Sequence, residues 1–263
     1  KCKESVRRHV DEFTDMTKRM GFWVDFDEAY WTMSPAYIES VWWSLQQIWN
    51  KGLLVQDHRV APYCPRCGTG LSDHELAQGY ETIKDPSVFV RFPATTGKLA
   101  ELKASLLVWT TTPWTLVANT AVAVNPKVDY QVIEITTDEK TERLVVASDL
   151  ASVLGEDRKV IATFKGTELE HTKYSRPFDF VEINDAHYVV LAEYVTVEDG
   201  TGLVHQSPAF GADDLEVCRR YHLPVVNPVS PDGHFNKEVP LVGGVFFKEA
   251  DKALIKDLKS RGL

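Results

Sequence analysis

The sequence predicts a mixed α/β protein, predominantly β, in which a β-barrel-like domain has flanking helices and a small cysteine knuckle. Three observations lead to this fold class. Short β-rich runs separated by Gly, Pro and Asn fill residues 80–248. Apolar side chains recur at helical spacing near both ends of the chain. A turn-rich segment with two closely spaced cysteines separates the first helices from the β-rich part.

Residues 1–61 are predicted to form a helical arm. Its clearest helix covers residues 37–54, where apolar side chains recur three and four positions apart, at Ile38, Val41, Trp42, Leu45 and Ile48. Pro35 is suited to a first helical turn, and Gly52 is suited to the end of a helix.

The cysteine knuckle is assigned to residues 62–79. Cys64 and Cys67 lie three positions apart, and His74 is a conceivable third metal ligand. A structural zinc ion normally takes four ligands in tetrahedral geometry, so this pair forms at most a partial metal site, expected to be empty in this chain. The other two cysteines, Cys2 and Cys218, are expected to be unpaired thiols.

The β-rich domain is assigned to residues 80–248 and a final helix to residues 249–263. Short runs within the domain predict strands over 87–92, 105–110, 120–124, 128–135, 143–148, 188–195, 202–206 and 241–247. One amphipathic helix is predicted over 213–222, and the closing helix is expected to end at Gly262. Such closely spaced strands favour a barrel or a compact sheet over repeated βαβ units.

Composition limits the classes of function. The chain has 263 residues and a formal net charge of −9. Binding to nucleic-acid phosphates needs clustered Lys and Arg, so this charge argues against a free-standing nucleic-acid binder. No run of about 18 apolar residues and no apolar leader is present, which predicts a cytoplasmic protein that does not enter a membrane.

The first segment with chemical potential is 108-VWTTTPWTL-116. Side chains alternate along an extended segment, so Thr110 and Thr112 are expected on one face. Pro113 lacks an N–H group and ends the strand ladder, which leaves a cluster of hydroxyls at the strand end. Such a cluster suits the rim of a binding site. The alternative is that threonine is simply favoured in strands.

The second segment is 200-GTGLVHQSPAFGADD-214. It places a lone His205 in a predicted strand and the carboxylates Asp213 and Asp214 at the start of a predicted helix. Each feature has a structural explanation, because acidic residues favour a helix N-terminus and a lone histidine is usually structural. Together, however, hydroxyls on one wall and a carboxylate on the other predict a site for a small ligand with a cationic group, such as an α-amino group.

Both segments resemble the editing domain of isoleucyl-tRNA synthetases, which is inserted into a class I Rossmann catalytic domain. The resemblance rests on 108-VWTTTPWTLVAN-119 and 200-GTGLVHQSPAFGADDLEVCRRY-221, and it extends to 62-PYCPRCGTGLSDHELAQGY-80 and 227-NPVSPDG-233. Valyl and leucyl editing domains typically carry an arginine before the corresponding proline. This chain has Thr112 there, which favours the isoleucyl group.

The resemblance implies hydrolysis of Val-tRNA(Ile), which a second site must remove because one methylene is worth only about 1–3 kcal/mol to an apolar pocket. It implies Asp214, His205 and Thr112 as the catalytic group. Asp214 would hold the substrate α-amino group and His205 would line the amino-acid pocket. Contacts to the ester, the terminal adenosine or water would come from Trp109, Thr110, Thr111, Thr112, Thr115 and Asn119.

The implied partners are mischarged tRNA(Ile) and the remainder of a synthetase, and we expect a monomer. No cofactor is implied for editing. The H-x-G-H and K-M-S-K-S signatures of the ATP-dependent synthetic site are absent, and a zinc ion in the parent family would draw its second ligand pair from beyond residue 263. Two alternatives stay open: a non-catalytic tRNA-binding or zinc-ribbon module, and an esterase for a valyl or leucyl system.

Overall fold

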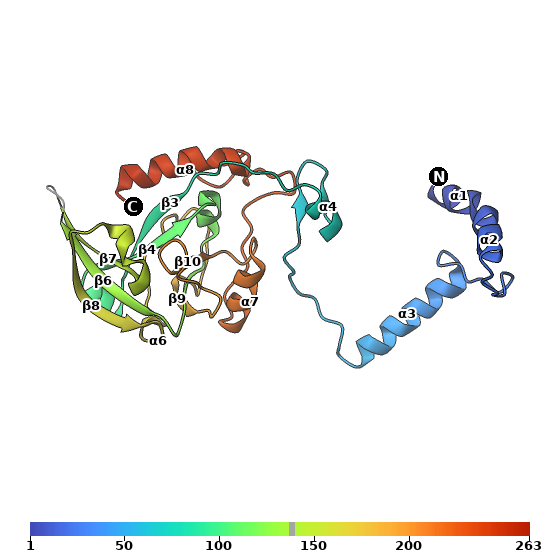
Figure 1. The fold of residues 1–263 in the computed structure, drawn as a ribbon, viewed down its shortest axis with the longest axis horizontal. Helices are drawn as coiled ribbons and strands as arrows, with labels where there is room; N and C mark the ends of the chain where they lie inside the picture. Colours follow the sequence, from blue (N-terminus) through green and yellow to red (C-terminus); the bar gives the residue numbers. More distant parts are fainter. Residues whose placement is uncertain (137–139) are drawn as a thin grey trace. The chain divides into compact units, whose positions relative to one another are not determined.

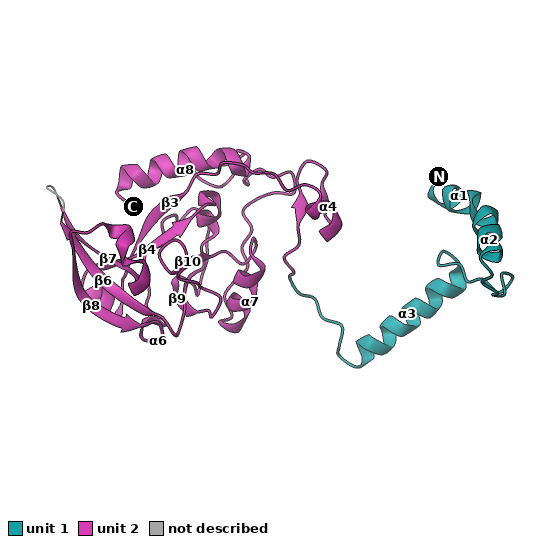
Figure 2. Ribbon diagram, viewed as in Figure 1, with its two compact units in different colours: residues 1–58 teal, residues 59–263 magenta. Residues whose placement is uncertain are grey.

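A computed structural model describes residues 1–136 and 140–263. These residues form two compact units, Lys1–His58 and Arg59–Leu263 (Figure 2). The boundary falls three positions before the end of the predicted helical arm. The candidate site residues and the cysteine pair all belong to the second unit.

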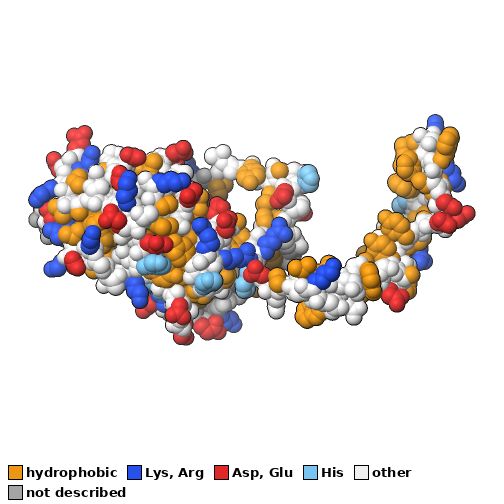
Figure 3. Space-filling model, turned by 90° about the horizontal axis from the view of Figure 1, so that it is seen from below, with side chains coloured by type: hydrophobic (Ala, Val, Ile, Leu, Met, Phe, Trp, Pro, Cys, Tyr) orange, Lys and Arg blue, Asp and Glu red, His pale blue; other side chains and the backbone are white. Residues whose placement is uncertain are grey.

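The first unit contains helices α1 (Cys2–Arg8), α2 (Val10–Arg19) and α3 (Pro35–Asn50). Ser34 caps α3, because its Oγ accepts a hydrogen bond from the Tyr37 N–H at 3.3 Å, and Pro35 occupies the first turn. The tryptophans of α3 are largely exposed, with Trp42 at 67% and Trp49 at 66% of full accessibility. Figure 3 shows hydrophobic side chains gathered along this unit. The unit therefore does not bury its own apolar stripe.

Two sheets organise the second unit (Figure 1). The larger has the order β3-β4-β7-β6-β8, with β3 (Val88–Pro93), β4 (Ala104–Thr110), β6 (Asp129–Thr136), β7 (Thr141–Ala147) and β8 (Arg158–Lys165). The smaller has the order β10-β5-β9, with β5 (Ala121–Val124), β9 (Tyr188–Leu191) and β10 (Leu203–Gln206). Pairing is antiparallel except between β4 and β7 and between β5 and β9, which are parallel.

The mixed α/β class is confirmed, but the barrel-like architecture is wrong. The described strands form separate open sheets, the larger with β3 and β8 at its edges. Strand β8 was not predicted, because residues 158–162 are exposed or half-buried and carry no clear alternation. The predicted strand over 241–247 is also wrong: that segment forms turns with positive φ at Leu241 and Gly244 before a helix begins.

Short helices connect the strands. They are α4 (Asp73–Ala77), α5 (Gly97–Glu101), the 3₁₀ helix η1 (Pro113–Ala118), the 3₁₀ helix η2 (Ser148–Leu154), α6 (Gly166–Leu169), α7 (Ala212–Arg220) and α8 (Phe247–Arg261). The helices predicted over 213–222 and 249–263 correspond to α7 and α8. Among the described residues, no helix combines the length and apolar character needed to cross a membrane.

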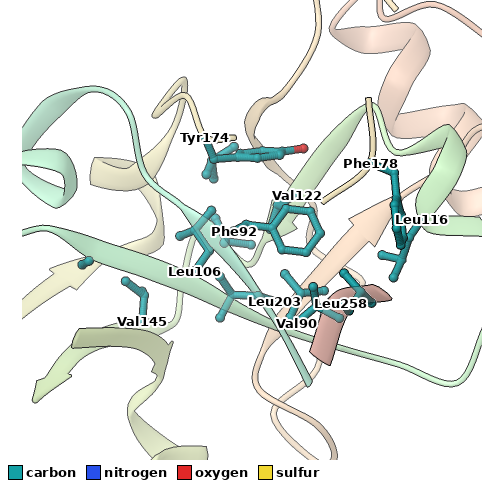
Figure 4. Close-up of a cluster of buried hydrophobic side chains, with 14 of the residues drawn as sticks. Val90, Phe92, Leu106, Leu116, Val122, Val145, Tyr174, Phe178, Leu203 and Leu258 are labelled. Atoms are coloured by element: carbon teal, nitrogen blue, oxygen red, sulfur yellow. The ribbon is translucent and has the colours of Figure 1, made fainter. Parts of the chain in front are cut away.

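The main core lies between the sheets and extends to α8. Phe92 of β3, Leu106 of β4, Val122 of β5 and Leu203 of β10 are fully buried together (Figure 4). Leu254 and Leu258 of α8 join the same cluster as Leu116 and Val117 of η1. Apolar burial therefore fixes η1, which follows the threonine-rich strand end, against the last helix.

The cysteine knuckle is not supported. Cys64 and Cys67 lie at the turn of a short hairpin between β1 (Tyr63–Cys64) and β2 (Thr69–Gly70). Hydrogen bonds from the Cys67 backbone and side chain lower the pKa of the Cys64 thiol. Over residues 1–136 and 140–263, no group of three or more His, Cys, Asp or Glu side chains is placed to hold a metal ion, so His74 does not complete a set. Two thiols do not meet the four-ligand requirement of structural zinc.

Candidate functional site

The threonine hydroxyls form a hydrogen-bonded chain where β4 ends. Thr110 Oγ1 lies 3.2 Å from Thr112 Oγ1 and accepts the Thr112 N–H at 3.1 Å. Thr112 Oγ1 lies 3.3 Å from Thr115 Oγ1, in the first turn of η1. The predicted common face of Thr110 and Thr112 is therefore present, and Pro113 turns the chain so that Thr115 joins them.

His205 extends this chain from the other sheet. It lies on β10, is buried, and has its Nε2 at 2.8 Å from Thr115 Oγ1. Burial lowers the pKa of His205 to about 4, so the imidazole is neutral near pH 7. Since Thr115 Oγ1 donates its proton to the Thr112 carbonyl at 2.8 Å, His205 Nε2 is the donor to Thr115. His205 Nδ1 is then a buried acceptor without a hydrogen-bond partner.

Asp214 lies in the first turn of α7 and is held by two neutral donors. The Ser207 N–H donates to Oδ2 at 2.8 Å, and the Tyr194 hydroxyl donates to Oδ1 at 3.4 Å. Burial raises the pKa of Asp214 to about 6, with the neighbouring charge of Asp213 acting in the same direction. A Cβ on Gly211 would lie 2.7 Å from Asp214 Cγ, so the absence of a side chain at Gly211 lets the carboxylate fold back over the helix start.

The hydroxyl cluster and the carboxylate, predicted as two walls of one site, both contact the segment that contains His205 and Ser207. His205 bonds the threonine chain, and Ser207, two positions later, bonds Asp214 through its backbone. Asp213, in contrast, is exposed. The structure thus links Thr110, Thr112, Thr115 and His205 by hydrogen bonds and ties Asp214 to the same segment.

A separate hollow of about 230 Å³ is lined by neighbouring segments, but not by the threonine chain, His205 or Asp214. Its lining includes Trp109 of β4, Tyr194, Asp199 and Gly200. Gly200 has φ +74°, and a Cβ there would lie 2.9 Å from Trp109 Cε3. Only glycine combines this backbone conformation with such a close approach to the indole. The glycine-rich turn therefore seats Trp109 at the edge of the hollow.

Two predicted site residues are not brought into this network. Asn119 is fully buried in the core, where it donates to the Ala121 carbonyl at 2.9 Å and accepts from the Tyr174 hydroxyl at 2.7 Å. Thr111 is exposed, since alternation along the strand end places it on the opposite face from Thr110. The geometry gives Asn119 a structural role.

Sequence reasoning missed Tyr194 and Gln206. The Tyr194 hydroxyl lies within hydrogen-bond distance of both amide atoms of Gln206, 2.7 Å from Nε2 and 3.0 Å from Oε1, as well as contacting Asp214. Gln206 directly follows His205, so strand alternation offered a weak signal that it lies on the other face of β10. Tyr194 carried no signal, because its partner is 20 positions away.

The site thus combines a neutral imidazole with a free acceptor, a chain of hydroxyls and a half-buried carboxylate, and Tyr194 connects that carboxylate to a small hollow. Hydroxyls and imidazole suit a polarised carbonyl or a water molecule, and the carboxylate suits a ligand cation. Among residues 1–136 and 140–263, no cationic side chain contributes to the pKa of Asp214, so the carboxylate has no strong positive partner there.

Comparison with known proteins identifies the family of the chain. The family model of class I tRNA synthetases (I, L, M and V) matches residues 1–210. The chain therefore belongs to the class I tRNA synthetases. Within that family it is similar to isoleucine--tRNA ligases. The enzyme of Streptomyces coelicolor is 66% identical over 266 residues, covering 100% of this chain and 25% of the relative.

More distant relatives agree. The isoleucine--tRNA ligase of Thermus thermophilus is 48% identical over 264 residues, again covering 100% of this chain and 25% of the relative. The chain thus spans about a quarter of the length of the curated relatives it matches. The crystal structure of GlLeuRS-CP1 shares the fold, with a TM-score of 0.52, 16% identity, and coverage of 67% of this chain and 96% of that chain. The resemblance read from the sequence is confirmed.

Proposed function

We propose that this chain is the editing part of an isoleucyl-tRNA synthetase and hydrolyses the ester of Val-tRNA(Ile). The observation that carries the proposal is the series of hydrogen bonds from Thr110 to His205. Ser207, two positions after His205, donates its backbone N–H to Asp214 and so connects the carboxylate to this series. The family membership and the match to isoleucine--tRNA ligases support it. Mischarged tRNA(Ile) and the rest of the synthetase are the proposed partners.

In this proposal Asp214 binds the ammonium group of the esterified valine. A carboxylate with only neutral protein donors around it gains most from a ligand cation, because an unpaired charge in a partly buried site is costly. Thr112 and Thr115 position the ester or the attacking water, and His205 borders the amino-acid pocket. The buried Nδ1 acceptor of His205 needs a donor, which substrate or water supplies.

The reaction needs no cofactor. The oxygen of water bonds to the ester carbonyl carbon, the bond from that carbon to the ribose oxygen breaks, and the ribose oxygen takes up a proton. The products are valine and tRNA(Ile). The hydrogen bonds of the threonine chain within the described part of the protein involve no charged base, so positioning and preorganised hydrogen bonds carry the rate enhancement.

A deacylation comparison tests this proposal. The full chain is incubated with Val-tRNA(Ile), Ile-tRNA(Ile) and Thr-tRNA(Val), and release of each amino acid is followed above the spontaneous rate. Selective release of valine from tRNA(Ile) supports the proposal. Equal, slow loss from every substrate would indicate a non-catalytic module, and preferential loss of threonine would indicate a valyl-type substrate. Because the net charge is −9, tRNA affinity is expected to be weak, so high enzyme concentration and low salt are required.

A further inference from the structure

Tyr194 connects three parts of the second unit. It lies three positions beyond the end of β9, its hydroxyl meets Gln206 of β10, and the same hydroxyl reaches Asp214 of α7. Tyr194 also lines the 230 Å³ hollow together with Trp109. Among the described side chains with a hydrogen bond to Asp214, Tyr194 is the one that also borders that hollow.

The direction of these hydrogen bonds follows from the number of protons. The hydroxyl has one proton to give, and Gln206 Nε2 donates to the hydroxyl oxygen at 2.7 Å. The hydroxyl proton then has two acceptors within reach, Gln206 Oε1 at 3.0 Å and Asp214 Oδ1 at 3.4 Å, and the charge of the carboxylate favours the second. Gln206 is fully buried and its strand pairs with β5, so this support for Tyr194 is rigid.

Asp214 is consequently held at both oxygens. The Ser207 N–H occupies one position on Oδ2 and Tyr194 occupies one on Oδ1. A carboxylate offers about four acceptor positions, so about two remain for a ligand ammonium group. With the Tyr194 contact removed, the carboxylate would be anchored at one oxygen only and free to rotate about its side-chain bonds.

We propose that Tyr194 is a positioning residue: supported by Gln206, it fixes the Asp214 carboxylate so that the unused acceptor positions meet the ammonium group of the aminoacyl ester. The inference rests on the proposed function for its ligand, but the positioning itself is a property of the protein alone. The group acts through Asp214 and not on the reacting ester.

The groups that face Asp214 determine how its pKa should respond when one of them is removed. Asp213 and Cys218 come from the same helix, Tyr194 comes from the segment after β9, and the Ser207 N–H comes from the segment after β10. Of these, only the donors Ser207 and Tyr194 favour the charged carboxylate. Removal of the Tyr194 hydroxyl should therefore make Asp214 harder to ionise.

The experiment compares Tyr194→Phe with Tyr188→Phe in the full chain. Tyr188 is the matched control, because its hydroxyl donates to the Tyr221 carbonyl at 3.3 Å, away from Asp214. The carboxyl titration of Asp214 is followed by carbon NMR, and valine release from Val-tRNA(Ile) is measured against pH. For Tyr194→Phe we expect an upward shift of the Asp214 pKa by about half a unit or more. We also expect a loss of about 3- to 10-fold in kcat/KM, larger near pH 6 than near pH 8.

Tyr188→Phe should leave both readouts unchanged within about twofold. An unchanged Asp214 titration in a folded Tyr194→Phe variant would overturn the inference, whether or not the chain hydrolyses the ester. A shifted titration in a chain that releases no valine would instead retain the positioning role and reject the proposed function. Thermal unfolding of both variants identifies any variant that fails to fold. In that case Gln206→Met, which keeps a similar side-chain size but removes the amide donor to Tyr194 without adding a charge, provides the second measurement through the same titration.

Discussion

The Asp251 carboxylate accepts a hydrogen bond from the Trp114 backbone N–H at 2.9 Å. Asp251 is buried on α8, and Trp114 lies between Thr112 and Thr115 in η1. The last helix, α8, is therefore hydrogen-bonded to the turn that carries the hydroxyls of the candidate site. Burial raises the pKa of Asp251, and the Trp114 N–H partly offsets that effect.

Removal of the hydrogen bond between Asp251 and the Trp114 N–H should lower both stability and activity. We expect Asp251→Ala to lower the free energy of unfolding by about 1–3 kcal/mol, because the Trp114 N–H loses its acceptor. Valine release should fall as well, since η1 positions Thr115. Urea unfolding and deacylation are the measurements, with Glu249→Ala, an exposed change on the same helix, as the control. Full activity and stability in Asp251→Ala would contradict the role given to α8.

Asp214→Asn should separate activity from stability. Valine release should fall sharply, because the neutral amide lacks the negative charge that pairs with the ammonium group. The folded-state pKa of Asp214 is raised to about 6, so the folded chain holds a proton that the unfolded chain releases at lower pH. The penalty for Asp214 therefore grows as the pH rises from about 4 to about 6 and is complete above that range.

The variant should accordingly be more stable than the parent near pH 7, by an amount on the order of 1–2 kcal/mol, and no more stable near pH 3. Unfolding curves at both pH values check this, with the exposed Asp213→Asn as the matched control. Equal stability of parent and variant at pH 7 would show that the carboxylate is not penalised by burial.

The pH dependence of valine release should be bell-shaped after the spontaneous rate is subtracted. The acid limb reports ionisation of Asp214 near pH 6. The basic limb reports loss of the proton from the substrate α-amino group, near the ordinary value of about 7.7–8. His205, with a pKa of about 4, should add no limb above pH 5. Activity that keeps rising beyond pH 9 would argue against recognition of an ammonium group.

Gly200→Ala tests whether the position of the Trp109 indole matters for activity. The new Cβ would lie 2.9 Å from the indole, and φ of +74° disfavours any side chain. Gly244→Ala shares the backbone penalty at φ +76° but meets no atom within 4 Å. Both variants should lose about 1 kcal/mol of stability from the backbone. Only Gly200→Ala should also lose activity, as measured by deacylation; similar activity in both would remove Trp109 from the site.

His205→Ala tests whether His205 limits the size of the amino-acid pocket. Replacement of the imidazole by a methyl group opens space next to Thr115, so hydrolysis of Ile-tRNA(Ile) should rise relative to that of Val-tRNA(Ile). The ratio of the two kcat/KM values is the measurement. Thr115→Ser, which keeps the hydroxyl bonded to His205, is the control. An unchanged ratio would assign His205 to positioning alone.

Part of this site could be read from the sequence. The common face of Thr110 and Thr112 follows from strand alternation, and the position of Asp214 follows from the helix start. The barrel prediction was wrong because strand runs do not specify strand order, and here β5 pairs in parallel with β9 across a long connection. Tyr194 was missed for the same reason: its contact with Asp214 depends on tertiary placement, which a local pattern does not encode.

The hydrogen bond and packing between α8 and η1 also have a consequence for synthesis on the ribosome. Trp114 and Asp251 are 137 positions apart, so the turn that bears Thr115 lacks its anchor until the nascent chain has grown through residue 251. At the usual 5–20 residues per second, that interval lasts roughly 7–27 seconds. During that time the apolar face of η1 is without the side chains of α8 that cover it in the folded chain.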